Sequence, residues 1–86
     1  MEFAVRVDVT HKEGILDPQG AAIERALPAL GYANVHGVSV GKMLSLTIDA
    51  SDEAAARAQV EEMCRRLLAN PVIENYALTL TTLERA

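Results

Sequence analysis

The first ten residues carry the pattern that constrains the fold most. Phe3, Val5, Val7 and Val9 alternate with residues that are mainly polar. Alternation with a period of two predicts a half-buried β-strand over residues 2–10. Such a strand belongs to a sheet with one apolar face and one polar face. The segment 11–16 that follows is predicted to be a connecting loop.

A short helix is predicted to follow this loop. Asp17 is a favourable N-cap residue, and Pro18 is tolerated at the first helical position because its missing N–H has no helical partner there. The predicted buried stripe consists of Ile23, Ala26, Leu27 and Leu30. Gly31 is typical of a helix end. Pro28 would break a helical hydrogen bond, so we expect a kink or an early end of the regular helix.

Residues 34–50 have the pattern of a β-hairpin. The apolar residues of its two predicted strands are Val35, Val38 and Val40 before the turn and Leu44, Leu46 and Ile48 after it. The intervening pair Gly41-Lys42 is typical of a type II′ turn, which has Gly at its first central position. Two further strands are therefore expected here.

The second predicted helix covers residues 52–69. Its apolar stripe consists of Ala56, Val60, Met63, Cys64, Leu67 and Leu68, and glutamate–arginine pairs four residues apart occupy the opposite face. Asn70-Pro71 is predicted to end the helix. Alternation over residues 73–83 predicts the last strand.

This element order, β-α-β-β-α-β, predicts an α+β fold of two layers in one domain over residues 1–86. Two helices would cover one face of a four-stranded antiparallel sheet, most simply in a ferredoxin-like arrangement. The open face would carry small and polar residues, namely Ala4, Arg6, Asp8, Ser45, Thr47, Thr79 and Thr81. Such a face favours docking against another protein over a fully solvated surface.

No catalytic residue, cofactor site or metal site is predicted for this chain. Cys64 lies on an apolar stripe and is expected to pack in the core, while His11 and His36 are expected on the surface. These three side chains do not have the spacing of metal ligands, and the phosphate-binding motif GxxxxGK[ST] is absent. The formal net charge of −4 and the three aromatic residues disfavour nucleic-acid binding.

The chain is expected to be cytoplasmic and to assemble with other chains. Its N-terminus lacks the pattern of a signal peptide, and no apolar run reaches the length of a membrane span. A core built from 86 residues is thin, and a single cysteine cannot form an internal disulfide. Association with a further copy of itself is the remaining way to bury more surface.

Four segments in order resemble the PurS family, the small subunit of multi-subunit phosphoribosylformylglycinamidine synthase. They are V-x-V-T-x-K near residues 5–12, L-D-P-Q-G at 16–20, A-L-x-x-L-G-Y at 26–32 with V-x-V-G-K at 38–42, and C-x-x-L-L-A-N-P-V-I-E at 64–74. The resemblance spans essentially the whole chain. Glu13, Pro28 and Ser39 depart from the pattern of such sequences, and Ser39 weakens any expectation of a charged contact beside V-G-K.

The resemblance implies a role in the fourth step of purine synthesis. That reaction converts formylglycinamide ribonucleotide, glutamine, ATP and water to formylglycinamidine ribonucleotide, glutamate, ADP and phosphate. A PurL-like large subunit would bind ATP and Mg²⁺, and a PurQ-like glutaminase would release ammonia. The small subunit, itself a dimer or a higher oligomer, would join the two without catalysing a step.

Residues at the motif loops are the candidates for contacts with these partners. They are Asp17, Pro18, Gln19, Gly20, Gly41, Lys42, Asn70 and Pro71. Lys42 is the best candidate for a charged contact. An alternative from a different class is an ACT-like regulatory module that binds a small molecule where two domains meet. Its usual cue, a glycine that opens directly into a helix, is poor here because Ile15 and Leu16 follow Gly14.

Overall fold

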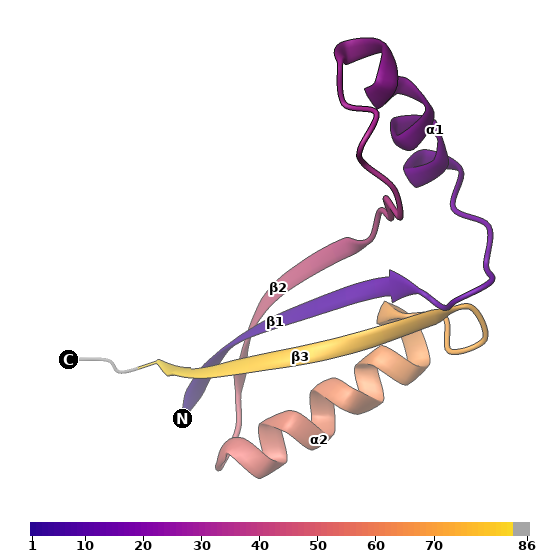
Figure 1. Ribbon diagram of the computed structural model, residues 1–86. Coiled ribbons are helices and arrows are strands. Elements are labelled where there is room, and N and C mark those ends of the chain that lie inside the picture. The colour runs from indigo at the N-terminus through magenta and orange to yellow at the C-terminus, as the bar shows by residue number, and fades with distance from the viewer. Residues whose placement is uncertain (84–86) are drawn as a thin grey trace.

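A computed structural model describes residues 1–83 of the chain (Figure 1). Its elements, in order, are β1 (Glu2–His11), α1 (Pro18–Ala26), the 3₁₀ turn η1 (Leu27–Leu30), β2 (Lys42–Asp49), α2 (Glu53–Met63), the π-helical turn η2 (Cys64–Leu68) and β3 (Glu74–Leu83). The α+β class is confirmed. Within these residues no helix is long and apolar enough to cross a membrane.

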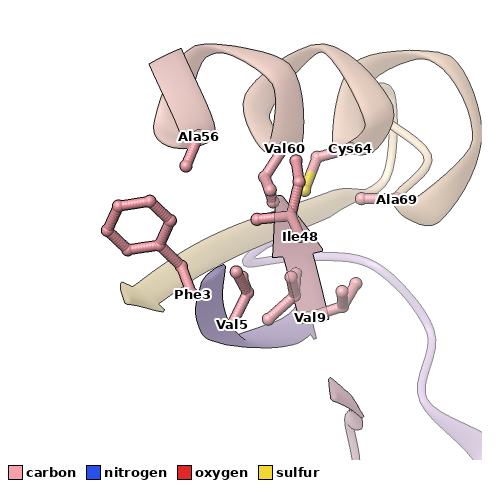
Figure 2. Close-up of a cluster of buried hydrophobic side chains, with 9 residues drawn as sticks. Phe3, Val5, Val9, Ile48, Ala56, Val60, Cys64 and Ala69 are labelled. Atoms are coloured by element: carbon pink, nitrogen blue, oxygen red, sulfur yellow. The ribbon is translucent and has the colours of Figure 1, made fainter. Parts of the chain in front are cut away.

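The three strands form one antiparallel sheet with the order β2-β1-β3. Val7 of the central strand lies opposite Leu44 on β2 and opposite Leu78 on β3. The alternating residues of β1 are buried beneath α2, as predicted. The core consists of Phe3, Val5, Val7, Val9 and Ile48 from the sheet and Ala56, Val60, Cys64 and Ala69 from the helical layer (Figure 2).

The predicted fourth strand is absent from the sheet that the structure describes. The N–H of Val38 donates to Glu24 Oε1 at 2.8 Å, and the N–H of Val40 donates to Asp17 Oδ2 at 2.8 Å. A type II′ turn needs a positive φ at Gly41, but the positive-φ glycines among residues 1–83 are Gly14, Gly31 and Gly37. The chain therefore continues into β2 without reversing, and the prediction of a hairpin over residues 34–50 was wrong.

Helix α1 does not cover the sheet, contrary to the prediction of two helices on one face. It projects from one end of the sheet, together with the segment that leads into β2 (Figure 1). The radius of gyration is 16.9 Å, whereas a compact chain of this length would have about 12 Å. The predicted buried stripe is largely exposed, with Ile23 at 46% and Leu30 at 71% of their full accessibility. We call residues 12–41 the arm.

The end of α1 follows the sequence prediction. Regular α-helix stops at Ala26, and the turn that contains Pro28 is 3₁₀. Gly31 then adopts φ 96°, a left-handed conformation that glycine tolerates at helix ends. Pro28 therefore shortens the α-helix, and the chain leaves it at the expected residue.

Helix α2 departs from the prediction near its C-terminus. Cys64–Leu68 forms a π-helical turn, which holds more residues per turn than an α-helix and shifts the buried face. Leu68 and Ala69 pack toward the core, while Met63 is 37% and Leu67 is 83% exposed. The prediction that Met63 and Leu67 belong to the buried stripe was wrong.

Candidate functional site

The eight predicted contact residues lie at or beyond one end of the sheet. Because β1 runs antiparallel to both neighbours, its last residues meet the first residues of β2 and β3. Val9 pairs with Lys42, and His11 pairs with Glu74. This end of the sheet therefore carries the arm, the start of β2 and the turn before β3 (Figure 1).

Asp17 holds the two halves of the arm together. Its Oδ1 accepts a hydrogen bond from the N–H of Gly20 at 3.1 Å, which caps α1 as predicted. Its Oδ2 accepts from the N–H of Val40 at 2.8 Å. The Val40 and Gly20 amides lower the pKa of the Asp17 carboxyl, and the charge of His11 lowers it further. The residue thus has a second role beyond capping, which the sequence did not reveal.

Glu24 is a second carboxylate with the same role. It accepts the Val38 N–H at 2.8 Å, two residues before the amide that Asp17 accepts. Asp17, Gly20 and Glu24 are spaced at i, i+3 and i+7, which places them along one side of a helix. The spacing alone could have indicated that Asp17 and Glu24 lie on the same side of the helix. Nothing in the sequence indicated that their carboxylates would accept hydrogen bonds from backbone amides. We call the two carboxylates and the two amides the carboxylate clamp.

Gly20 and Gly41 allow close backbone approaches within this end of the molecule. A Cβ on Gly20 would lie 2.7 Å from the carbonyl oxygen of Val38 and would also collide with the Asp17 carboxylate. A Cβ on Gly41 would collide with the carbonyl oxygen of Val9. The glycines of the L-D-P-Q-G and V-G-K segments are therefore required by packing, and the two segments form one structural unit.

Asn70 organises the turn before β3. Its side-chain Oδ1 accepts the N–H of Val72 at 3.1 Å, and its own N–H donates to Glu74 Oε1 at 2.7 Å. The N–H of Lys12 donates to the carbonyl of Ile73 at 2.8 Å, so this turn is joined to the end of β1. Asn70 and Pro71 are exposed and end the second helix as predicted.

The remaining predicted contact residues point to solvent. Pro18, Gln19 and Lys42 are exposed. Lys42 forms no ion pair with any residue between 1 and 83. Its ammonium group is therefore available to a carboxylate on another chain.

The open face of the sheet is hollowed and has the predicted composition. A shallow depression of about 420 Å³ is lined by Ala4, Val5, Arg6, Ser45, Leu46, Thr47, Thr79 and Thr81. Arg6 Nε bonds Asp8 Oδ1 at 3.1 Å. Short side chains on a concave face leave room for a protein surface to approach the strands.

The reactive side chains do not gather into a catalytic arrangement in the part of the chain described. Cys64 is fully buried, as predicted, and burial, aided by the nearby Glu61, raises the pKa of its thiol. His36 is exposed, whereas His11 is half-buried and its Nδ1 lacks a hydrogen-bond partner. No three histidine, cysteine or acidic side chains among residues 1–83 are close enough to hold a metal ion.

Curated relatives match nearly the full length of the chain. The phosphoribosylformylglycinamidine synthase subunit PurS of Synechocystis is 48% identical over 84 residues, which covers 98% of this chain and 84% of that protein. The subunit PurS of Bacillus subtilis is 47% identical over 74 residues, with 86% and 87% covered. The match includes the arm and the sheet alike.

Solved structures agree in fold. The PurS subunit of Thermotoga maritima superimposes with a TM-score of 0.85 at 31% identity, covering 94% of this chain and 93% of that one. A chain of the PurLQS structure from the same organism gives the same score and identity over 94% and 99%. Residues 4–82 match the family model described as PurS, phosphoribosylformylglycinamidine (FGAM) synthase. With the motif loops, the fold and these matches in agreement, the chain belongs to the PurS family.

Proposed function

We propose that this chain is the small, non-catalytic subunit of a phosphoribosylformylglycinamidine synthase. Its role is to join a PurL-like synthetase subunit and a PurQ-like glutaminase subunit in the cytoplasm, so that ammonia released from glutamine reaches the synthetase. The ligase activity belongs to the complex, with ATP and Mg²⁺ bound by the large subunit. Family membership favours this role over the alternative of an ACT-like regulatory module.

The observation that carries the proposal is the likeness to a PurLQS chain over 94% of the sequence, arm included. A chain that catalyses no step contributes to a multi-subunit enzyme through its surfaces. The candidates are the exposed motif residues at one end of the sheet and the hollow open face. Both lie outside the core, so a partner can contact them without disturbing the packing.

Self-association is part of the proposed role. Within residues 1–83 the core comprises nine buried side chains. Most of the large apolar residues of the arm are exposed, namely Ile15, Leu16, Ile23, Leu30, Tyr32 and Val35. Small domains with limited cores are commonly completed by a second copy, most often with two-fold symmetry. Sedimentation equilibrium at micromolar concentration is expected to show at least a dimer, and a stable monomer would contradict this part of the proposal.

Reconstitution tests the subunit role directly. Alone, the chain is expected to show neither ATPase, glutaminase nor amidine-forming activity. Added to the large and glutaminase subunits of the family, it is expected to restore glutamine-dependent product formation. Ammonia-dependent turnover is expected to need it less, because free ammonia bypasses the transfer. Equal glutamine-dependent turnover with and without the chain would refute the proposal.

Lys42→Glu locates the contact within the chain. Because Lys42 is exposed and unpaired among residues 1–83, reversing its charge is expected to weaken complex assembly and glutamine-dependent turnover and to leave the fold intact. Arg57→Glu on α2 is the control away from the motif loops; because Arg57 also pairs with Glu53 at 3.9 Å, the stability of this variant is measured alongside its assembly. Equal losses from both variants would indicate a general charge effect rather than a contact at Lys42.

A further inference from the structure

His11 lies at the joint between the sheet and the arm. It is the last residue of β1 and pairs with Glu74 of β3. The arm begins at the next residue, where the N–H of Lys12 donates to the carbonyl of Ile73 at 2.8 Å, and residues 13–16 are exposed. Within residues 1–83, α1 packs extensively only on the turn η1 and not on a strand. The position of the arm therefore depends on the few residues at this joint (Figure 1).

The imidazole of His11 has an unsatisfied nitrogen at this joint. The side chain is half-buried, and its Nδ1 is inaccessible to solvent and has no hydrogen-bond partner among residues 1–83. Buried polar atoms in folded proteins are nearly always hydrogen-bonded, so this exception requires an explanation. A neutral imidazole has one donor and one acceptor, whereas a protonated imidazole has two donors and a positive charge. Protonation therefore changes which neighbouring groups His11 attracts.

The titratable groups near His11 on the sheet and in the helical layer are fixed or uncharged. Glu74 lies opposite on β3, but its Oε1 accepts the N–H of Asn70 at 2.7 Å, which directs this carboxylate into the turn. Tyr76 follows two residues later on the same face, and tyrosine is neutral near pH 7. The helical layer contributes Cys64 to the core, where burial raises the pKa of the thiol (Figure 2). None of these groups belongs to the arm.

Asp17 is the group through which the charge of His11 acts on the arm. The two amide hydrogen bonds lower the pKa of Asp17 most, and the charge of His11 lowers it further, so the two side chains attract each other. Each carboxylate oxygen accepts one amide and retains capacity for a further donor. Lys12 and Glu13, which follow His11 in the chain, carry opposite charges that offset each other. Because Asp17 holds both halves of the arm together, a force on its carboxylate acts on the whole arm.

We propose that His11 is a proton-controlled latch between the sheet and the arm. When the imidazole is protonated, it attracts the carboxylate of Asp17 and draws the arm toward the end of the sheet. When the imidazole is neutral, this attraction is absent and the arm is released. The L-D-P-Q-G segment lies on the arm and Asn70 lies in the turn before β3, so the latch sets the spacing between these motif loops. The inference goes beyond the proposed function and does not depend on it.

The direction of the pH dependence follows from the two groups of the latch. The pKa of Asp17 lies below its ordinary value of 3.8, so this carboxylate stays ionised near neutral pH. Histidine is the side chain whose charge normally changes between about pH 5 and pH 8. The latch is therefore expected to be closed at about pH 5.5 and open at about pH 8.

Residual dipolar couplings, measured by nuclear magnetic resonance on the full chain, test the latch. They report the orientation of α1 relative to β1, which is expected to differ between the lower and the higher pH. His11→Gln keeps a polar side chain but removes the titration, so this variant is expected to show one orientation at both pH values. A single orientation at both pH values in the unmodified chain would overturn the inference.

His36→Gln is the matched control. His36 is the other histidine of the chain and is exposed on the arm. Its replacement is expected to leave the full pH response in place. A response that was lost in His36→Gln, or kept in His11→Gln, would overturn the assignment to His11. Reconstituted turnover decides the proposed function and the couplings decide the latch, so either can fail while the other stands.

Amide signals provide a second measurement that needs no histidine variant. In the unmodified chain the amides of Gly20 and Val40 are expected to shift between about pH 5 and pH 8, in step with the ring signals of His11. Asp17→Asn is expected to abolish this shift, whereas Glu74→Gln retains it. A shift that was absent from the unmodified chain, or that survived Asp17→Asn, would overturn the inference. Loss of the shift in Glu74→Gln would place the partner of His11 on β3 and would overturn it as well.

Discussion

The sheet with α2 and the arm are held in place by different forces. The sheet buries a continuous apolar cluster in which Val7, Val60 and Cys64 are fully inaccessible. In α1, by contrast, Gly20 is the only buried residue, and the arm is shaped by carboxylate–amide hydrogen bonds and close glycine contacts. The same chain thus combines a domain built on hydrophobic packing with an extension built on polar contacts.

The two kinds of interaction determine different properties: apolar burial determines the stability of the fold, and directional hydrogen bonds determine the shape of the arm. Burial of apolar surface is non-directional and contributes most of the free energy of folding. A single hydrogen bond contributes only about 0.5–3 kcal/mol of net free energy, but it is directional and fixes the path of the backbone. We therefore expect core substitutions to unfold the molecule and arm substitutions to alter its shape or assembly.

The largest expected effect comes from the core. Phe3→Ala removes a side chain that is 1% exposed at the end of the apolar row of β1. The lost burial and the cavity are expected to lower the free energy of unfolding by about 3 kcal/mol. Urea denaturation followed by circular dichroism measures this change.

Leu30→Ala is the matched truncation in the arm. Leu30 is 71% exposed, so its replacement is expected to change the free energy of unfolding by less than about 0.5 kcal/mol. A cost for Leu30→Ala that approached that of Phe3→Ala would show that the arm is packed in solution, and the contrast between the two regions would fail.

Gly41→Ala tests the junction between the two regions. The new methyl group would collide with the carbonyl of Val9, which is part of the backbone and cannot move without disturbing β1. A loss of about 2 kcal/mol is expected, measured by the same denaturation. Ser39→Ala, at an exposed position two residues earlier, is the control and is expected to be near neutral. Equal stability of both variants would mean that the arm can pivot freely at Gly41.

The sheet was predictable from sequence because hydrophobic periodicity reports burial within the chain. The alternation around Val5 and Val7 predicted the first strand and its buried face, though not its central place in the sheet, and Asp17-Pro18 predicted the start of α1. Open-face residues such as Thr79 were also placed correctly.

The arm was not predictable by the same reasoning. Val38 and Val40 have the pattern of a strand, but periodicity does not specify what a strand pairs with. The N–H groups of these two valines donate to side-chain carboxylates instead of to a neighbouring strand. No sequence pattern distinguishes this kind of pairing. Likewise, the apolar stripe at Ile23 indicates a face that requires burial without indicating whether its own chain supplies the cover. The exposure of Leu67 was missed for a different reason. Sequence periodicity assumes a regular α-helix, and the π-helical turn at this point changes which residues face the core.

Cys64→Ala tests the other region, the hydrophobic core of the sheet and α2. Cys64 is fully buried and packs with Val60, so removing its sulfur is expected to cost about 1 kcal/mol and to leave the turnover of an assembled complex intact. Because burial raises the pKa of the thiol, alkylation is expected to be slow in the native chain and fast in denaturant. Rapid alkylation of the native chain would place Cys64 outside the core.

The most specific expected effect on the shape of the arm comes from Asp17→Asn, which removes the charge that accepts two backbone amides. Hydrogen bonds from Val40 and Gly20 lower the pKa of Asp17 below the ordinary value of 3.8, so the folded arm binds the proton less readily than the unfolded chain. The hydrogen bonds that Asp17 accepts therefore stabilise the arm fully above the ordinary pKa of 3.8, and they are lost as the pH falls through the lowered pKa of Asp17. Nuclear magnetic resonance is expected to show the amide signals of Val40 and Gly20 titrating together, with a midpoint below 3.8.

Asp17→Asn abolishes this titration, while Asp52→Asn, which removes the equivalent cap of α2, leaves it unchanged. If Val40 did not titrate in the unmodified chain, the arm would be held by its apolar contacts, and the distinction between the two regions would be wrong.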